Sequence, residues 1–208
     1  NTSGVSGSSD AFMVGVGAGE VGTVNIFDGG SVNTLGGGVE TFIGDLAGGQ
    51  GFVTVHAGGT LNPVKALEVI NGQLTFAPTA NDVTGFKDEL VIDNDGILAI
   101  QTDGLISATI HGAVAENLEL GANSTLDMQL GGTFNVGDSW TVIDGIGTFS
   151  GVVGGDGTGV FGTIYDSTDA NNAFSATYTG GAVVVTLTAI PEPATLGILA
   201  AFGGGILF

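Results

Sequence analysis

The sequence contains no cysteine and no arginine, and its only basic residues besides two histidines are Lys65 and Lys87. The absence of cysteine excludes disulfides, thiolate metal sites and a cysteine nucleophile. Two lysines cannot build a basic patch, which excludes nucleic acid and anionic membrane surfaces as partners. With 21 acidic residues the formal net charge is −19, so the chain attracts cations as its counter-species.

Proline and charged residues are also scarce. Four prolines exclude a collagen-like or polyproline chain. Charged residues make up 11% of the chain, whereas about 25% is ordinary. Glycine occupies 40 of the 208 positions, and hydrophobic residues account for 43%, which is too high for a disordered protein. The length suits one domain with a substantial core or at most two small domains.

Short segments of alternating apolar and polar residues follow one another from about residue 17 to residue 188, separated by Gly, Asn and Asp. This alternation with a period of two residues is typical of half-buried β-strands. Residues 22–33 align without gaps on residues 51–62, at an offset of 29 residues, and looser copies of the same unit begin at Leu67, Leu90 and Leu118. The unit is a strand, a tight turn and a second strand.

One such unit cannot bury its apolar face, but stacked copies bury a continuous core. We therefore predict an all-β fold in which residues 17–138 form a glycine-rich parallel β-solenoid, with a Greek-key β-sandwich as the alternative. Aromatic residues, including Trp140, concentrate in residues 139–188, which we predict to be a β cap over the terminal coil. Residues 1–16 are predicted to be an N-terminal arm, and residues 189–208 an apolar tail.

The tail combines a Pro-Glu-Pro sequence, Pro191, Glu192 and Pro193, with an uncharged apolar segment at residues 194–208. The prolines end the preceding strand, and 15 apolar residues fall short of the roughly 20 that span a bilayer as a helix. A segment of this length can still form a short helix rich in small residues that packs closely against a partner.

This tail resembles the PEP-CTERM sorting signal of Gram-negative surface proteins, although it has no basic end. The glycine-rich repeats are similar, more weakly, to the passenger repeats of autotransporter adhesins. The resemblance implies export, transient membrane contact through the tail, and a place in an outer matrix rich in exopolysaccharide. The chain begins at Asn1 rather than Met, as a secreted protein does once its leader is removed. We therefore expect a secreted protein at the cell surface.

Two apolar segments suggest self-assembly. The N-terminal segment can donate a strand to a neighbouring copy through Ala11, Phe12, Met13, Val14 and Val16. The apolar side chains of the tail need burial that a partner subunit can provide, and they are Leu196, Ile198, Leu199, Phe202, Ile206, Leu207 and Phe208. We predict a structural subunit that polymerises into a surface filament or biofilm-matrix fibre. A monomeric adhesin or glycan-binding module tethered by its tail is the alternative.

Few residues suggest chemistry. Asp93 and Asp95 have the spacing of a weak calcium loop, but Gly104 stands where such a loop has Glu, so a plain Asx turn competes with this interpretation. A β-helix glycosidase would need two carboxylates facing one sugar, and the candidate pairs are Asp88/Glu89, Glu116/Glu119 and Asp166/Asp169. Neither His56 nor His111 has a second metal ligand beside it. We expect no enzymatic activity and no cofactor, unless calcium or other cations bind.

Overall fold

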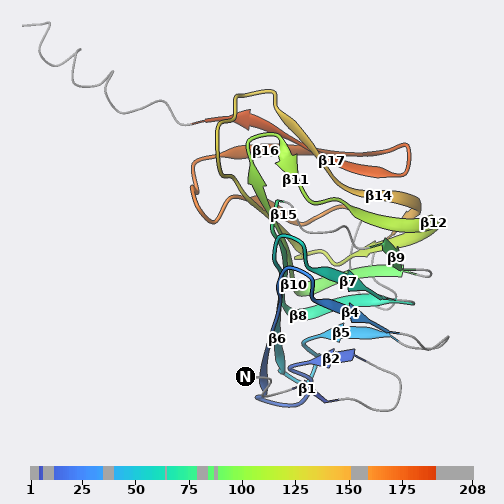
Figure 1. Ribbon diagram of the computed structural model, residues 1–208. Helices are drawn as coiled ribbons and strands as arrows, with labels where there is room; N and C mark the ends of the chain where they lie inside the picture. The colour runs from blue at the N-terminus through green and yellow to red at the C-terminus, as the bar shows by residue number, and fades with distance from the viewer. Residues whose placement is uncertain are drawn as a thin grey trace, which may run out of the picture.

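The computed structural model describes residues 5–6, 12–34, 40–63, 65–78, 84–86, 89–150 and 159–190. Every regular element within these ranges is a β-strand, and strands stack from coil to coil into a solenoid (Figure 1). Pairing between successive coils is parallel. The predicted parallel β-solenoid is therefore confirmed, and a sandwich of antiparallel sheets is excluded. The Pro-Glu-Pro sequence and the apolar tail lie outside the described residues.

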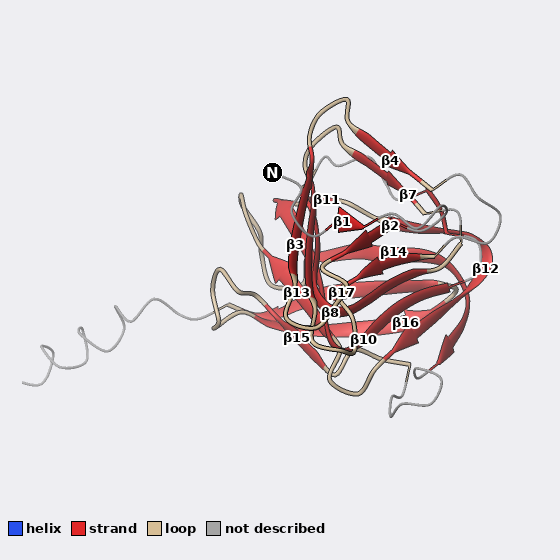
Figure 2. Ribbon diagram, turned by 90° about the horizontal axis from the view of Figure 1, so that it is seen from below, coloured by secondary structure: helices blue, strands red, loops and turns tan. Residues whose placement is uncertain are grey.

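Each turn of the chain adds strand segments to three faces, which Figure 2 shows from below. Face one contains β2 (Phe12–Val14), β5 (Thr41–Ile43), the first halves of β8 (Leu67–Phe76) and β10 (Glu89–Asp103), and the second halves of β12 (Ile110–Leu120) and β14 (Ser139–Ser150). Face two contains β3 (Val21–Ile26), β6 (Gln50–Val55), the second halves of β8 and β10, β13 (Thr125–Gln129) and β15 (Thr163–Tyr165). Face three contains β4 (Ser31–Asn33), β7 (Thr60–Asn62), β9 (Thr84–Phe86) and the first halves of β12 and β14.

An antiparallel hairpin ends the stack on face three. In it β17 (Ala182–Ala189) pairs antiparallel with β14, and β16 (Ala173–Thr179) pairs antiparallel with β17. β14 belongs to both parts, because it also pairs in parallel with β12. Parallel pairing continues past residue 138 to β15, which pairs with β13. Two short strands complete the fold: β1 (Val5–Ser6) lies antiparallel to β2, and β11 (Ile106–Ser107) folds back on β10.

The gapless repeat in the sequence corresponds to the first two coils. Val21 pairs with Gln50 and Ile26 with Val55, which is the same 29-residue offset seen in the alignment. β4 and β7 keep that offset and form a separate two-stranded sheet, in which Asn62 donates a hydrogen bond to the side chain of Asn33 at 2.7 Å. Because the 29-residue offset is the same in both strand pairs, equivalent residues of the two coils are paired with one another.

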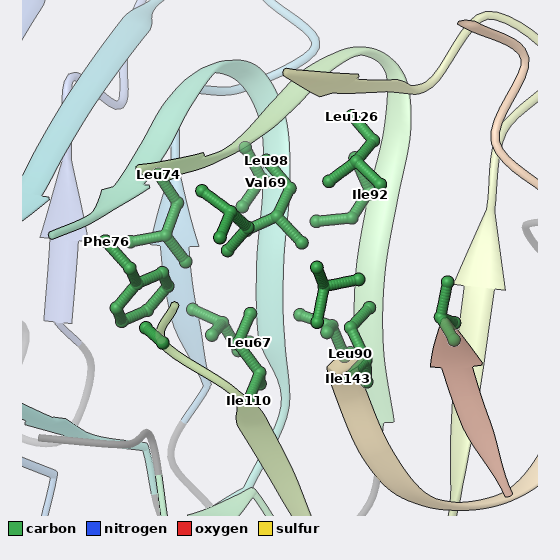
Figure 3. Close-up of a cluster of buried hydrophobic side chains, with 14 of the residues drawn as sticks. Leu67, Val69, Leu74, Phe76, Leu90, Ile92, Leu98, Ile110, Leu126 and Ile143 are labelled. Atoms are coloured by element: carbon green, nitrogen blue, oxygen red, sulfur yellow. The ribbon is translucent and has the colours of Figure 1, made fainter. Parts of the chain in front are cut away.

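Buried side chains form columns that run through the coils. The column of face two contains Val53, Leu74, Leu98 and Leu126, each paired with the next. Figure 3 labels the last three of these side chains. A second column on face one contains Val14, Ile43, Val69, Ile92 and Leu120. All of these side chains are buried. Because full burial of an aliphatic side chain contributes roughly 1.5–3 kcal/mol, the columns are the main source of stability.

Glycine forms the corner between faces one and two. Gly22, Gly51 and Gly72 stack in register at this corner. A Cβ on Gly51 would lie 2.4 Å from the carbonyl oxygen of Val14, which is closer than any real contact. The coils can therefore approach one another here only because these positions have no side chain.

Candidate functional site

The first coil presents two strand edges that have no partner strand in the described part of the chain. β3 pairs only with β6, and β4 pairs only with β7. β2 differs, because β1 covers its outer edge through the Val5–Val14 and Ser6–Met13 pairs. An uncovered strand edge offers unpaired backbone N–H and C=O groups to another chain. The open edges of β3 and β4 are therefore candidate contact surfaces.

The predicted donor segment is part of the solenoid itself. Val14 is fully buried beneath Ile43, and Phe12 packs against the core. Met13 points outward, and Val16 follows at the corner. Ala11 lies outside the described residues. Donating β2 to a neighbour would uncover the first layer of the core, so this structure places the donor residues within the fold of their own chain.

A groove with a volume of about 250 Å³ lies on the outer side of face one at the first coils. Its lining residues are Met13, Val16, Phe42, Gly44, Asp45, Leu46 and Ile70. Leu46 at its margin is 85% exposed, which is the highest value among the large hydrophobic residues that the structure describes. Sequence reasoning missed Phe42, although its alternation with the buried Thr41 and Ile43 already places it on the outer side.

Hydrogen bonds fix the one acidic residue that lines the groove. The Asp45 carboxylate accepts hydrogen bonds from the backbone N–H of Gly17 at 2.7 Å and of Gly49 at 2.8 Å. The bond from Gly17 ties the corner of the first coil to that of the second, and the bond from Gly49 closes the turn within the second coil. Because both oxygens of the single acidic lining residue are engaged, the surface that the groove offers is apolar.

Beyond the groove, the outer side of face one is acidic. Glu68 lies among four other carboxylates, those of Glu40, Glu89, Asp93 and Glu119. Partial burial and the repulsion from these carboxylates raise the pKa of Glu68 from 4.5 to about 7. Lys65 offsets the charge of one of these carboxylates, since its ammonium lies 3.3 Å from the carboxylate of Glu40.

The predicted calcium residues lie where β10 passes the corner between faces one and two. The pairing of β10 with β8 shifts register between Ile92 and Asp95, so the chain bends there within one continuous strand. Over the described ranges, no three His, Asp or Glu side chains converge in a way that could hold a metal ion.

The candidate carboxylate pairs lie in two different parts of the fold, the loop after β15 and the strand β12. Asp166 is buried and accepts hydrogen bonds from Thr168 and Asn172, while Asp169 accepts two from Asn171. These two carboxylates therefore order the loop that follows β15. Glu119 is buried on β12, and Glu116 lies where the pairing of β12 with β14 shifts register. Asp88 lies outside the described residues.

Both histidines bridge neighbouring coils. His111 contacts the carboxylate of Asp144 at 2.5 Å on face three, where the two residues are paired in register. His56 hydrogen-bonds to Asn25 at 3.0 Å and stacks on the ring of Phe27, with ring centroids 4.5 Å apart. Phe27 is 62% exposed. The pair forms a flat aromatic surface at the corner between faces two and three.

No helix in the described ranges has the length and apolar character to cross a membrane. When the chain is compared with known proteins, no family model matches it and no curated protein is similar to it.

Proposed function

We propose that this chain is an extracellular structural protein that self-assembles into a surface filament or biofilm-matrix fibre. The observation that carries the proposal is the pair of open strand edges on β3 and β4 at the first coil. Strand addition at such an edge would extend the parallel sheets from one copy into the next. The scarcity of charge and the resemblance of the tail to a sorting signal support an outer, structural location.

Electron microscopy of the purified chain tests this proposal, with a variant that blocks the edge. Thr23→Lys places a charge on the outer side of β3, next to the backbone that a partner strand would contact, and should abolish filaments. Thr125→Lys is the matched control, because Thr125 lies on the same face but in a strand paired on both sides. Single monodisperse particles from the wild-type chain would refute the proposal.

A glycan-binding module is the second candidate, and the exposed Phe27–His56 stack favours it. A flat aromatic surface beside the amide of Asn25 combines the apolar and hydrogen-bonding groups that a sugar ring can contact. Binding of exopolysaccharide by wild-type monomers, lost in Phe27→Ala, would support this function over self-assembly. Equal binding by the wild type and Phe27→Ala would show that the Phe27–His56 stack does not bind the polysaccharide.

A further inference from the structure

We infer that the groove lined by Met13, Phe42, Leu46 and Ile70 binds the apolar tail, residues 194–208, of a second copy of this chain. The inference rests on the proposed self-assembly and names the contact that joins one copy to the next. An apolar groove that is exposed to water has a free-energy cost, and a tail with apolar side chains has the same kind of cost. Burial of the tail in the groove removes both of these free-energy costs.

The two surfaces match in chemistry. The groove offers Met, Phe, Leu and Ile side chains, and its one acidic residue, Asp45, is already hydrogen-bonded to Gly17 and Gly49. The tail has no charged residue from 194 to 208 and contains Leu196, Leu199 and Phe202 among its large side chains. A charged partner segment would bury its charge without compensation in this groove, so an uncharged apolar segment is the occupant that fits.

The position of the chain end favours a neighbour's groove over the chain's own. The described chain ends at Ile190, after β17, at the opposite end of the solenoid from the groove (Figure 1). Residues 191–208 could extend roughly 60 Å, so length permits either route. A tail that folds back along face one, however, would lay apolar side chains over the carboxylates around Glu68. A copy stacked head to tail would bring its first coil to the end where the tail emerges.

Repetition of this contact produces a filament. Ile190, from which the donor tail continues, and the acceptor groove lie at opposite ends of each copy, so the contact joins two different surfaces. Such a head-to-tail contact generates an open chain of subunits unless the rotation between copies happens to close a ring. The tail would therefore determine the polarity of the fibre, while the open edges of β3 and β4 contribute backbone pairing.

Disulfide trapping tests the contact directly, because the chain has no cysteine of its own. A Leu46→Cys chain mixed with a Leu199→Cys chain should give a cross-linked heterodimer as the main product of mild oxidation. Leu105→Cys is the matched control: Leu105 is 65% exposed but lies near β11, away from the groove. Equal cross-linking from Leu105→Cys would show unspecific association. A Leu46→Cys/Leu199→Cys double variant that forms only an intramolecular disulfide would assign the groove to the chain's own tail. Either this result or equal cross-linking of the control would overturn the inference.

A second variant separates this inference from the proposed function. Leu46→Asp should raise the critical concentration for filaments by roughly tenfold or more, since it removes the burial of one leucine, whereas Leu105→Asp should leave it unchanged. Filaments that form equally well from Leu46→Asp would refute the tail contact and leave the structural function standing. A wild-type chain that stays monomeric at every concentration would refute the structural function itself.

Discussion

Thr41 is a polar residue in an otherwise apolar column of face one, between Phe12 and Leu67. Its side chain is fully buried, and its hydroxyl has no hydrogen-bond partner among the residues that the structure describes. A buried hydroxyl without a partner costs about 1–3 kcal/mol relative to one in water. At the residue scale, therefore, the core contains a position that is not optimised for stability.

Thr41→Val should increase the free energy of unfolding by about 1 kcal/mol, because valine keeps the shape and removes the unpaired hydroxyl. The matched control is Thr102→Val, since the buried Thr102 hydroxyl accepts a hydrogen bond from the backbone N–H of Gly131 at 3.2 Å. That variant should be destabilised. Urea denaturation of both variants gives the comparison, and a change of the same sign in both would contradict the expectation.

Glu68 makes stability depend on pH. Its pKa in the folded state is about 7, above the ordinary value of 4.5, so the folded state binds more protons than the unfolded state between these pH values. The free energy of unfolding should therefore decrease as the pH rises from 4.5 to 7 and then level off. Well below pH 4.5 the carboxyl group is protonated in both states and contributes no difference.

Glu68→Gln should consequently be more stable than the wild type at pH 8 and equal to it at pH 4. Glutamine has nearly the same shape as glutamate but carries no charge to be repelled by Glu40, Glu89 and the other carboxylates nearby. Urea midpoints for both proteins at the two pH values measure the effect, and the pH 4 comparison is the internal control. Identical differences at both pH values would show that charge is not the cause.

At the scale of elements, register determines which side chains meet on the outer faces. Parallel pairing at constant offset places Asn33 against Asn62 and Gln101 against Gln129, and both amide pairs are hydrogen-bonded. The same register joins His111 to Asp144. These bonds connect adjacent coils where salt bridges are almost lacking, since the chain has only two lysines.

The corners decide how closely the coils stack, and Gly44→Ala tests this. Gly44 and Gly19 both have a φ of 77°, but a Cβ on Gly44 would lie 1.8 Å from the carbonyl oxygen of Asn71, and one on Gly19 would meet no described atom within 4 Å. Gly19→Ala should therefore cost only the conformational strain of about 1–2 kcal/mol. Gly44→Ala should cost clearly more in thermal or urea unfolding, and equal losses would contradict close packing at this corner.

At the scale of the whole molecule, charge opposes both folding and assembly. A net charge of −19 on 208 residues leaves every pair of approaching copies mutually repelled. Salt weakens this repulsion, because the screening length falls from about 30 Å at 0.01 M to about 8 Å at 0.15 M ionic strength.

Raising NaCl from about 0.01 M to 0.15 M should therefore increase the urea midpoint and lower the concentration at which filaments form. Sedimentation and urea denaturation measure the two effects. Calcium chloride at matched ionic strength is the control, because general screening predicts a similar effect from both salts. A much larger effect of calcium, reversed by a chelator, would instead indicate specific cation binding. No dependence on salt would contradict the electrostatic account.

The sequence predicted the strand register of the first two coils directly, but that of the later coils less completely. The gapless match of residues 22–33 to residues 51–62 reproduces the register of β3 on β6 and of β4 on β7. β8, β10 and β14 were harder to anticipate as single elements, because each continues around a corner that the sequence marks only with glycine or a register shift. The groove could not be predicted, since its lining comes from three coils that stack at different offsets.

The sequence by itself determined an all-β chain of repeated strand units, for which a β-solenoid was preferred to a β-sandwich, and the acidic, cysteine-free character of the chain. These properties depend on periodicity, repeats and counts, which are local or additive. Only the tertiary structure decided that β2 belongs to the core, that β3 and β4 each have an edge without a partner strand among the described residues, and that Met13, Phe42 and Ile70 meet in one groove. Such properties depend on which coil follows which and at what register, and that is set by packing between residues far apart in the chain.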